Sequence, residues 1–383
     1  MLSLTTPVSS TFDVLRHSPQ LLANARRRLF DRDSLVAAGK TPFDVIHRHG
    51  TVSLRYYPAL TDAHITLADG STQAVAQQTH HTPLVLVPPL AVNMLVYDLF
   101  PERSLVRYLR ARGFDLYMVD WGTPSWSDNK RHLADYFASL LREMLNRVRF
   151  HSGRSRLNLH GWSLGGLFAL CHAAMADPDT IANLVLVGAP VDYHNNGILG
   201  ERYKNFAHAA RQVRARTGLT AHRLPTTLLR SPGWLNSLAF KLTSPVASVR
   251  NYQQLLANLH DTEYVASNAT NAAFLDGMVA YTGGAVADFI DYFWVENRLA
   301  SGRLPMRQPS AGLDRVRAPI LNITGRDDPI VTPSCSQAMQ GLVSSTDVTC
   351  RSVAGGHVGI VSSALAQRET WPQIVDWLIA RDG

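Results

Sequence analysis

One serine of the chain stands between two glycines where a strand pattern gives way to a helix pattern. The segment Gly161-Trp162-Ser163-Leu164-Gly165 follows the strand pattern 157–160 and precedes a helical pattern over 164–176. Glycines permit the tight, strained turn that raises a serine hydroxyl above a sheet edge. We therefore predict that Ser163 is a nucleophile. The backbone N–H of Leu164, at the start of the helix, is expected to face the oxyanion formed during acyl transfer.

A serine hydroxyl is a weak nucleophile at neutral pH and needs an adjacent base, itself oriented by a carboxylate. Both partners are expected after late strands, in the chain order serine, acid, histidine. The glycine-rich loop 355–359 supplies the base, His357, and the loop after the strand pattern 320–324 contains Asp327 and Asp328. We predict Asp328 as the acid, because a Gly-x-x-Asp step followed by an apolar pair has the usual spacing after such a strand. Asp327 remains the alternative acid.

A second oxyanion donor is expected in the loop that follows the apolar strand pattern 84–87. This loop reads Pro88-Pro89-Leu90-Ala91-Val92. Proline has no backbone N–H, so Leu90 or Ala91 must donate. We predict Leu90.

The segments around these loops alternate between short apolar strands and helices, which is typical of an open, mostly parallel sheet with helices on both faces. Together with the serine turn, this pattern predicts an α/β-hydrolase fold. The alternation stops between residues 191 and 312, where the pattern is mainly helical, and an insertion at this place would form a cap over the site. We therefore predict an N-terminal helical segment (1–50), a first core part (51–190), a helical cap insertion (191–312) and a second core part (313–383).

The strand patterns lie at 52–57, 64–67, 84–87, 115–120, 157–160, 181–187, 319–324 and 348–353. Helical patterns lie at 11–38, 101–112, 133–150, 164–176 and 371–380.

Composition narrows the classes of function. The chain has 383 residues, 46% of them hydrophobic and 17% charged, as in a globular protein with a sizeable core. Its net charge of +7 comes without any nucleic-acid-binding signature, so no nucleic acid partner is expected. Three scattered cysteines make neither a disulfide framework nor a metal site, and we expect no metal and no cofactor. With no signal peptide pattern and no transmembrane segment, a cytoplasmic location is expected.

Beyond the serine turn, the sequence resembles the polyhydroxyalkanoate synthases along most of its length. The motifs that carry the resemblance are Thr41-Pro42-Phe43-Asp44-Val45-Ile46, Leu54-Arg55-Tyr56-Tyr57, Val87-Pro88-Pro89, Asp98-Leu99, Arg103-Ser104-Leu105-Val106-Arg107, Asp115-Leu116-Tyr117-Met118-Val119-Asp120-Trp121-Gly122, Pro190-Val191-Asp192-Tyr193 and Gly355-Gly356-His357-Val358-Gly359-Ile360. The resemblance implies an acyl-transfer site for 3-hydroxyacyl-coenzyme A, a cap domain, and association into homo-oligomers or with polymer granules.

The chain departs from that family at the nucleophile, because the synthases carry cysteine within G-x-C-x-G and this chain has Ser163. A serine adduct is an oxyester, which is less activated toward a hydroxyl acceptor than a thioester. The leading hypothesis is therefore a serine hydrolase or acyltransferase that acts on acyl esters or acyl-coenzyme A. The alternative is a polyhydroxyalkanoate synthase that polymerises 3-hydroxyacyl-coenzyme A. A non-catalytic interaction protein is disfavoured by the complete set of serine, acid and histidine.

Overall fold

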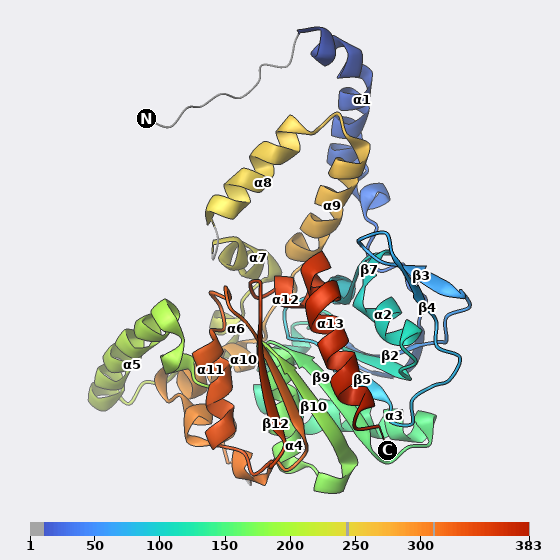
Figure 1. Cartoon of the computed structure of the whole chain (residues 1–383). Coiled ribbons are helices and arrows are strands. Elements are labelled where there is room, and N and C mark those ends of the chain that lie inside the picture. The colour runs from blue at the N-terminus through green and yellow to red at the C-terminus, as the bar shows by residue number, and fades with distance from the viewer. Residues whose placement is uncertain (1–10, 243–244, 309–310, 383) are drawn as a thin grey trace.

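The computed structural model describes residues 11–242, 245–308 and 311–382 (Figure 1). A single eight-stranded sheet forms its centre, in the order β1-β2-β8-β5-β9-β10-β11-β12. The first two strands in this order are antiparallel to their neighbours, and the pairs from β8 to β12 are parallel. The strands of this sheet are β1 (Asp44–His49), β2 (Val52–Tyr57), β5 (Leu84–Val87), β8 (Leu116–Asp120), β9 (Leu157–Trp162), β10 (Ile181–Val187), β11 (Ile320–Gly325) and β12 (Val348–Val353).

The central strands are apolar on both faces because each face is covered by helices. In β5 all four side chains are buried, and alternate ones enter different clusters: Val85 and Val87 on one side, Leu84 and Leu86 on the other. The first cluster includes side chains of α3 (Leu141–Ser152) and α4 (Leu164–Met175), and the second includes those of α2 (Leu105–Ala111) and α13 (Ala364–Ile379). The sheet is therefore the middle layer of three, as predicted.

A helical insertion leaves the core after β10 and returns before β11, and it lies beyond one edge of the sheet (Figure 1). Its α-helices are α5 (Gly197–Thr217), α6 (Thr226–Leu229), α7 (Gly233–Leu242), α8 (Pro245–Ala257), α9 (Thr262–Asp276) and α10 (Gly283–Asp288), and α10 continues into the π-helical segment η8 (Phe289–Val295). We call this insertion the cap. Residues 309–310, which belong to the predicted cap, lie outside the described residues, as do 243–244.

The N-terminal helix α1 (Thr11–Phe30) packs on the cap, beside α9 (Figure 1). Gln20 Nε2 donates to Thr262 Oγ1 at 2.6 Å, and Asn24 Nδ2 donates to the Leu259 carbonyl at 3.0 Å. Residues 1–10 of the predicted N-terminal segment lie outside the described residues.

Other short elements complete the chain. Two-stranded sheets are formed by β3 (His64–Thr66) with β4 (Thr72–Ala74) and by β6 (Asp98–Phe100) with β7 (Arg103–Ser104). The remaining helical segments are η1 (Arg32–Leu35), η2 (Met94–Tyr97), η3 (Ser127–Lys130), η4 (Asp135–Leu140), η5 (Pro178–Thr180), η6 (Tyr193–Asn195), η7 (Ala221–Arg223), η9 (Arg298–Ser301), η10 (Leu313–Arg315), α11 (Pro333–Gln337), η11 (Ala338–Gly341) and α12 (Gly359–Ser362).

Several helix boundaries differ from the predictions. The helix expected over 133–150 contains a π-helical segment, η4, ahead of α3, and the helix expected over 11–38 ends at Phe30. The last helix begins at Ala364 rather than near Trp371, because Ser363 accepts the N–H of Ala366 and caps it. Within the described residues, no helix combines the length and the hydropathy needed to cross a membrane.

Candidate active site

The loops singled out by the sequence all leave the sheet at the carboxyl ends of parallel strands. The loop with Leu90 follows β5, Ser163 follows β9, Asp328 follows β11 and His357 follows β12. Parallel strands end at the same edge of a sheet, so residues more than 100 positions apart in the chain meet there. This edge is where a ligand site in an open α/β sheet is expected.

Ser163 lies in the strained turn that its glycine neighbours predicted. Its φ of 53° and ψ of −127° place it outside the regions that most residues adopt. The turn is crowded on all sides: a Cβ on Gly161 would lie 2.4 Å from the Gly166 Cα, and one on Gly165 would lie 1.9 Å from the Val87 carbonyl oxygen. These positions require glycine, because the turn at Ser163, called here the elbow, packs directly against its own helix and against β5.

The hydroxyl of Ser163 faces the imidazole of His357. Ser163 Oγ donates to His357 Nε2 at 2.8 Å, and His357 Nδ1–H donates to Asp328 Oδ2 at 2.7 Å. A carboxylate can only accept, so this second bond puts the imidazole proton on Nδ1 and leaves the Nε2 lone pair for the serine. The histidine is 6% exposed and the aspartate 4% exposed, so the hydrogen bond between them is shielded from water.

The structure places Asp328, and not Asp327, against the histidine. The second oxygen of Asp328, Oδ1, accepts the N–H groups of Ile330 and Val331, each at 2.9 Å. The carboxylate is thus held at both oxygens and aimed by its own loop. Asp327 is exposed, and its recorded bond is a backbone one, from its N–H to the Gly355 carbonyl at 3.4 Å.

The tryptophan inside the serine turn is a contact that the sequence analysis did not single out. Trp162 Nε1 donates to the His357 carbonyl at 3.1 Å, and its ring lies 5.5 Å from the imidazole, centroid to centroid. The elbow therefore fixes the backbone of the histidine loop as well as presenting the nucleophile. A motif of the form G-x-S-x-G carries no signal for this contact, because the middle residues are unrestricted.

Backbone N–H groups are available near the serine for an oxyanion. Leu164 is the first residue of α4, and the first N–H groups of a helix have no partner within it. Among the described residues, none accepts from the N–H of Leu90 or Ala91. Ala91 has a φ of 63°, which is unusual for a residue with a Cβ. The structure leaves Leu90 and Ala91 both free to donate, so the choice of Leu90 remains a prediction.

The same loop is tied to the cap by Asn93. Its Nδ2 lies within hydrogen-bonding distance of the carbonyl oxygens of Ala273, Phe274 and Gly277, at 3.2–3.3 Å. Nearby, the N–H of Val279 donates to the Ala91 carbonyl at 3.0 Å. The candidate oxyanion loop therefore takes part of its position from the end of α9, which no sequence pattern indicated.

Other nucleophile candidates are poorly placed for chemistry. Cys171 lies inside α4 with no exposure, and burial raises the pKa of its thiol, which agrees with the expectation that it packs in the core. Burial also raises the pKa of Cys335 to about 12. Buried thiols that stay protonated are inert.

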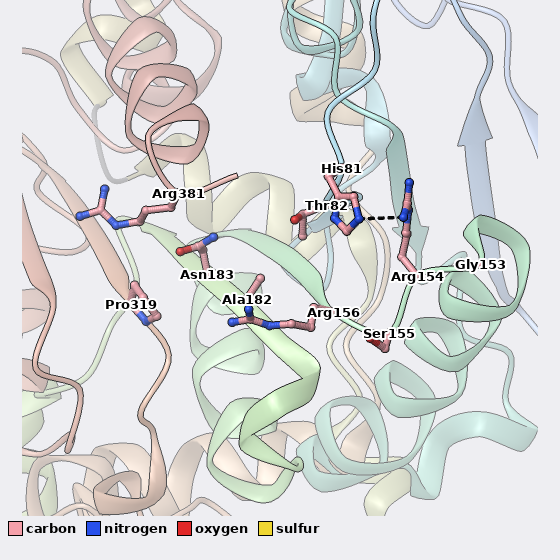
Figure 2. A pocket seen from close by; sticks show the side chains of 10 residues that line it. All are labelled: His81, Thr82, Gly153, Arg154, Ser155, Arg156, Ala182, Asn183, Pro319 and Arg381. Atoms are coloured by element: carbon pink, nitrogen blue, oxygen red, sulfur yellow. Dashed lines mark hydrogen bonds between the residues drawn. The ribbon is translucent and has the colours of Figure 1, made fainter. Parts of the chain in front are cut away.

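Figure 2 shows a cavity of about 390 Å³ that lies elsewhere in the fold. Apart from Arg381, which follows α13, its lining residues precede or begin strands β5, β9, β10 and β11, at the amino ends of the sheet. Arg154 and Arg156 project around it, and Arg154 donates to His81 Nε2 at 2.7 Å. Because it opens at the opposite edge of the sheet, this cavity is separate from Ser163.

Comparison with known proteins identifies the fold family. The family model described as alpha/beta hydrolase fold matches residues 82–363, which is more than half of the chain. The chain therefore belongs to the alpha/beta hydrolase fold family, as predicted. A soluble variant of the monoglyceride lipase of Saccharomyces cerevisiae has a similar fold, with a TM-score of 0.53, 13% identity, and coverage of 90% of this chain and 96% of the lipase.

Within this family the chain is similar to polyhydroxyalkanoate polymerases. It is 27% identical over 387 residues to the poly(3-hydroxyalkanoate) polymerase subunit PhaC of Haloferax mediterranei, covering 98% of this chain and 73% of that protein. It is 28% identical over 308 residues to the subunit of the same name from Allochromatium vinosum, covering 80% of this chain and 83% of that protein. The resemblance to this group is confirmed, and the chain is an enzyme of the hydrolase or polyhydroxyalkanoate synthase-like type.

Proposed function

We propose that this protein is an acyltransferase that loads 3-hydroxyacyl groups from coenzyme A thioesters onto Ser163 and passes them to a hydroxyl acceptor, as a polyhydroxyalkanoate synthase does. The observation that carries the proposal is the hydrogen-bonded series Ser163–His357–Asp328 in a chain similar to a polyhydroxyalkanoate polymerase along 98% of its length. Of the two functions expected from the sequence, the relatives support the synthase alternative better than the hydrolase.

In the first step, His357 Nε2 takes the Ser163 proton while Oγ attacks the thioester carbonyl carbon. The oxyanion is stabilised by the N–H of Leu164 and of Leu90 or Ala91. The carbon–sulfur bond then breaks, and the coenzyme A sulfur leaves as a thiol after taking the proton from His357. The product is an oxyester on Ser163. Asp328 stabilises the imidazolium that forms in each half of the reaction.

In the second step, His357 takes a proton from the 3-hydroxyl group of another acyl unit or chain end. That oxygen attacks the acyl carbonyl, the ester bond to Ser163 breaks, and Oγ recovers its proton from His357. One oxyester replaces another, so this step has a small driving force and loading from the thioester drives the cycle. Water in place of the hydroxyl gives hydrolysis.

Ser163 itself favours the hydrolase as the second candidate, because an oxyester adduct is the ordinary intermediate of serine esterases. The two functions differ only in which oxygen reaches the acyl-enzyme. We propose that the cap, which holds the Ala91–Asn93 loop through α9 and Val279, limits entry of water and admits the acceptor.

The deciding experiment incubates the full chain with 3-hydroxybutyryl-coenzyme A and measures free thiol, free 3-hydroxybutyrate and chloroform-soluble polyester. The expected result is thiol release with oligomer or polymer, both lost in Ser163→Ala. Thiol release matched by free acid would replace the synthase proposal with the hydrolase. Thiol release that persists in Ser163→Ala would remove Ser163 from the mechanism.

The cap also carries the feature that supports association with a polymer surface. Large apolar side chains are exposed on its helices, namely Ile198, Leu228, Trp234 and Leu242, with 63–78% of each accessible. Trp234 and Leu242 both lie on α7, and a helix with several exposed apolar groups can bind an apolar partner. We propose that these helices contact polyester granules. Cosedimentation with polyhydroxybutyrate particles tests this, and binding that is unchanged in Trp234→Ser with Leu242→Ser would contradict it.

A further inference from the structure

A second group of chemically active side chains lies where the cap meets the core. His132 precedes η4 in the core, while His222 is in η7 and Asp288 ends α10, both in the cap. We call these three residues the His–Asp cluster. Asp288 Oδ1 lies 3.0 Å from His132 Nδ1 and 2.8 Å from His222 Nε2. Each residue offers one atom that could bind a metal, and these three atoms all lie within 4.8 Å of one another.

Other groups hold the ligand atoms of the cluster in place. His222 Nδ1 lies 2.5 Å from Asp291 Oδ2, which fixes the ring orientation and keeps Nε2 toward the cluster. The second oxygen of Asp288 accepts the Leu133 N–H at 2.7 Å, which leaves Oδ1 toward the histidines. A histidine whose outer nitrogen donates to a carboxylate is the usual arrangement around protein-bound zinc.

Burial and charge favour a cation at this place. The Asp288 side chain is 2% exposed, and with Asp291 it puts two carboxylates beside two imidazoles. When both histidines are neutral, the two negative charges are offset by one divalent cation. Two arginines of the adjoining cavity, Arg214 and Arg298, pair with Glu296 at 3.0 and 2.7 Å rather than with these carboxylates.

Space for a further ligand is present. The cluster opens onto a cavity of about 860 Å³, lined also by Thr220 and Arg298. The backbone nearby is unusual as well, because π-helical segments begin three residues after His132 and directly after Asp288. Such segments are rare and frequently occur at functional sites.

We propose that His132, His222 and Asp288 bind a divalent transition metal, with Zn²⁺ preferred and a water molecule as the fourth ligand. Two imidazoles and one carboxylate form a ligand set that zinc accepts in tetrahedral geometry. The metal would join one core ligand to two cap ligands and so fasten the cap over the sheet edge. The sequence predicted no metal, because these residues lie 90 and 66 positions apart and form no spacing motif.

The alternative for the same geometry is a network in which protons on the histidines offset the carboxylates. The protonated network excludes a metal ion, because an imidazolium has no lone pair for a metal. A direct binding measurement therefore separates them.

The test uses the full chain, stripped with a chelator and dialysed, then titrated with Zn²⁺ by calorimetry and with Co²⁺ by visible absorption. We expect one equivalent of Zn²⁺ to bind, tetrahedral Co²⁺ bands to appear, and Zn²⁺ to raise the melting temperature. His132→Gln should abolish the Co²⁺ bands, and this residue is 42% exposed at its side chain, so the variant should fold. Asp291→Asn should weaken Zn²⁺ binding about 10–100-fold, as loss of a supporting carboxylate does.

His64→Gln is the matched control, because His64 is exposed in β3 and lies outside the cluster. It should bind Zn²⁺ as the unmodified chain does. Absence of a one-equivalent event in the unmodified chain, or equal binding by His132→Gln, would overturn the proposal. Neither readout depends on acyl transfer, so the result is independent of the proposed function.

Discussion

The hydroxyl of Ser163 lies 2.8 Å from the Nε2 of His357, which is placed to accept its proton. That nitrogen is free to accept only while Nδ1 carries the ring proton, and the Asp328 carboxylate enforces this tautomer. The hydrogen bonds thus link the Ser163 hydroxyl to a carboxylate two hydrogen bonds away. Single conservative substitutions can therefore test the role of each of these side chains.

We expect Asp328→Asn to lower the rate of thiol release by about 10²–10⁴-fold, because an amide cannot stabilise the imidazolium and allows the wrong tautomer. Asp327→Asn is the matched control, since that side chain is exposed and makes no recorded bond to His357. Asp327→Asn should lower the rate of thiol release by less than about threefold, as expected for a substitution at the surface. The measurement is kcat for each variant at saturating substrate, and the reverse ranking would transfer the role of acid to Asp327.

Ser163→Cys tests how much the nucleophile limits chain transfer. The acyl adduct becomes a thioester, which is more activated toward a hydroxyl than an oxyester. We expect the ratio of polyester to free acid formed from 3-hydroxybutyryl-coenzyme A to rise above that of the unmodified chain. A folded cysteine variant that releases only free acid would show that the cap, rather than the nucleophile, decides the acceptor.

At the scale of elements, the sheet edge places loops that the sequence separates widely. Strands 52–57, 84–87, 181–187 and 348–353 fall where the sequence predicted them. For β5 and β10 the reason is that buried parallel strands leave a continuous apolar run. The strand β1 was not predicted, since its burial pattern shows mostly exposed positions at the sheet edge. The loops with Ser163, Asp328 and His357 could be singled out in the sequence because glycines and strand ends mark them, and the structure brings these three side chains together.

The contact between Asn93 and the cap could not be predicted in the same way. It joins a core loop to the end of α9 across 180 positions, and its acceptors are backbone carbonyls, which any residue provides. The His–Asp cluster is hidden for a similar reason, because its members come from separate turns. Contacts of this kind depend on how the cap docks, which local patterns do not encode.

Asn93 is a positioning residue for the candidate oxyanion loop, and it performs two tasks with different atoms. Oδ1 accepts the Leu95 N–H at 3.2 Å and caps η2, while Nδ2 donates to the cap. Asn93→Asp keeps the acceptor and loses the donor. We expect kcat to fall about tenfold with KM nearly constant. Removal of an oxyanion donor itself lowers kcat about 10²–10³-fold, and loss of a residue that only positions the donor should lower it less.

The readout for Asn93→Asp is the split between kcat and KM, with thermal melting measured in parallel. Asn258→Ala is the control, because its Nδ2 donates within its own segment, to the Gln254 carbonyl at 2.8 Å, and Asn258 lies outside the candidate oxyanion loop. A fall in kcat matched by an equal loss in the control, or a change in melting with unchanged kcat, would mean that Asn93 serves only folding.

At the scale of the whole molecule, the sheet, the cap and α1 form one continuous body in which polar groups are buried along with the apolar core. Two histidines illustrate the free-energy cost of burying a polar group. Burial lowers the pKa of both His160 and His172 to about 4, so each stays neutral in the folded state at pH 5. His172 Nδ1 still finds the Phe137 carbonyl at 2.9 Å, whereas the Nδ1 of His160 has no partner among the described residues.

These histidines predict acid sensitivity of folding. Their pKa in the folded state lies below the value of about 6.5 for an exposed histidine, so the unfolded chain binds protons first as pH falls. Their contribution to stability is therefore present above pH 6.5 and is lost as pH falls toward 4. At pH 5 each would cost about 1–2 kcal/mol relative to pH 7. The measurement is the free energy of unfolding in urea at both pH values. His172→Gln, which removes one titrating group, should reduce the difference by about that amount, while His64→Gln, at an exposed position of β3, should leave it unchanged. An equal pH dependence in His172→Gln and the unmodified chain would mean that His172 does not titrate differently in the two states, and that acid acts on folding through other groups.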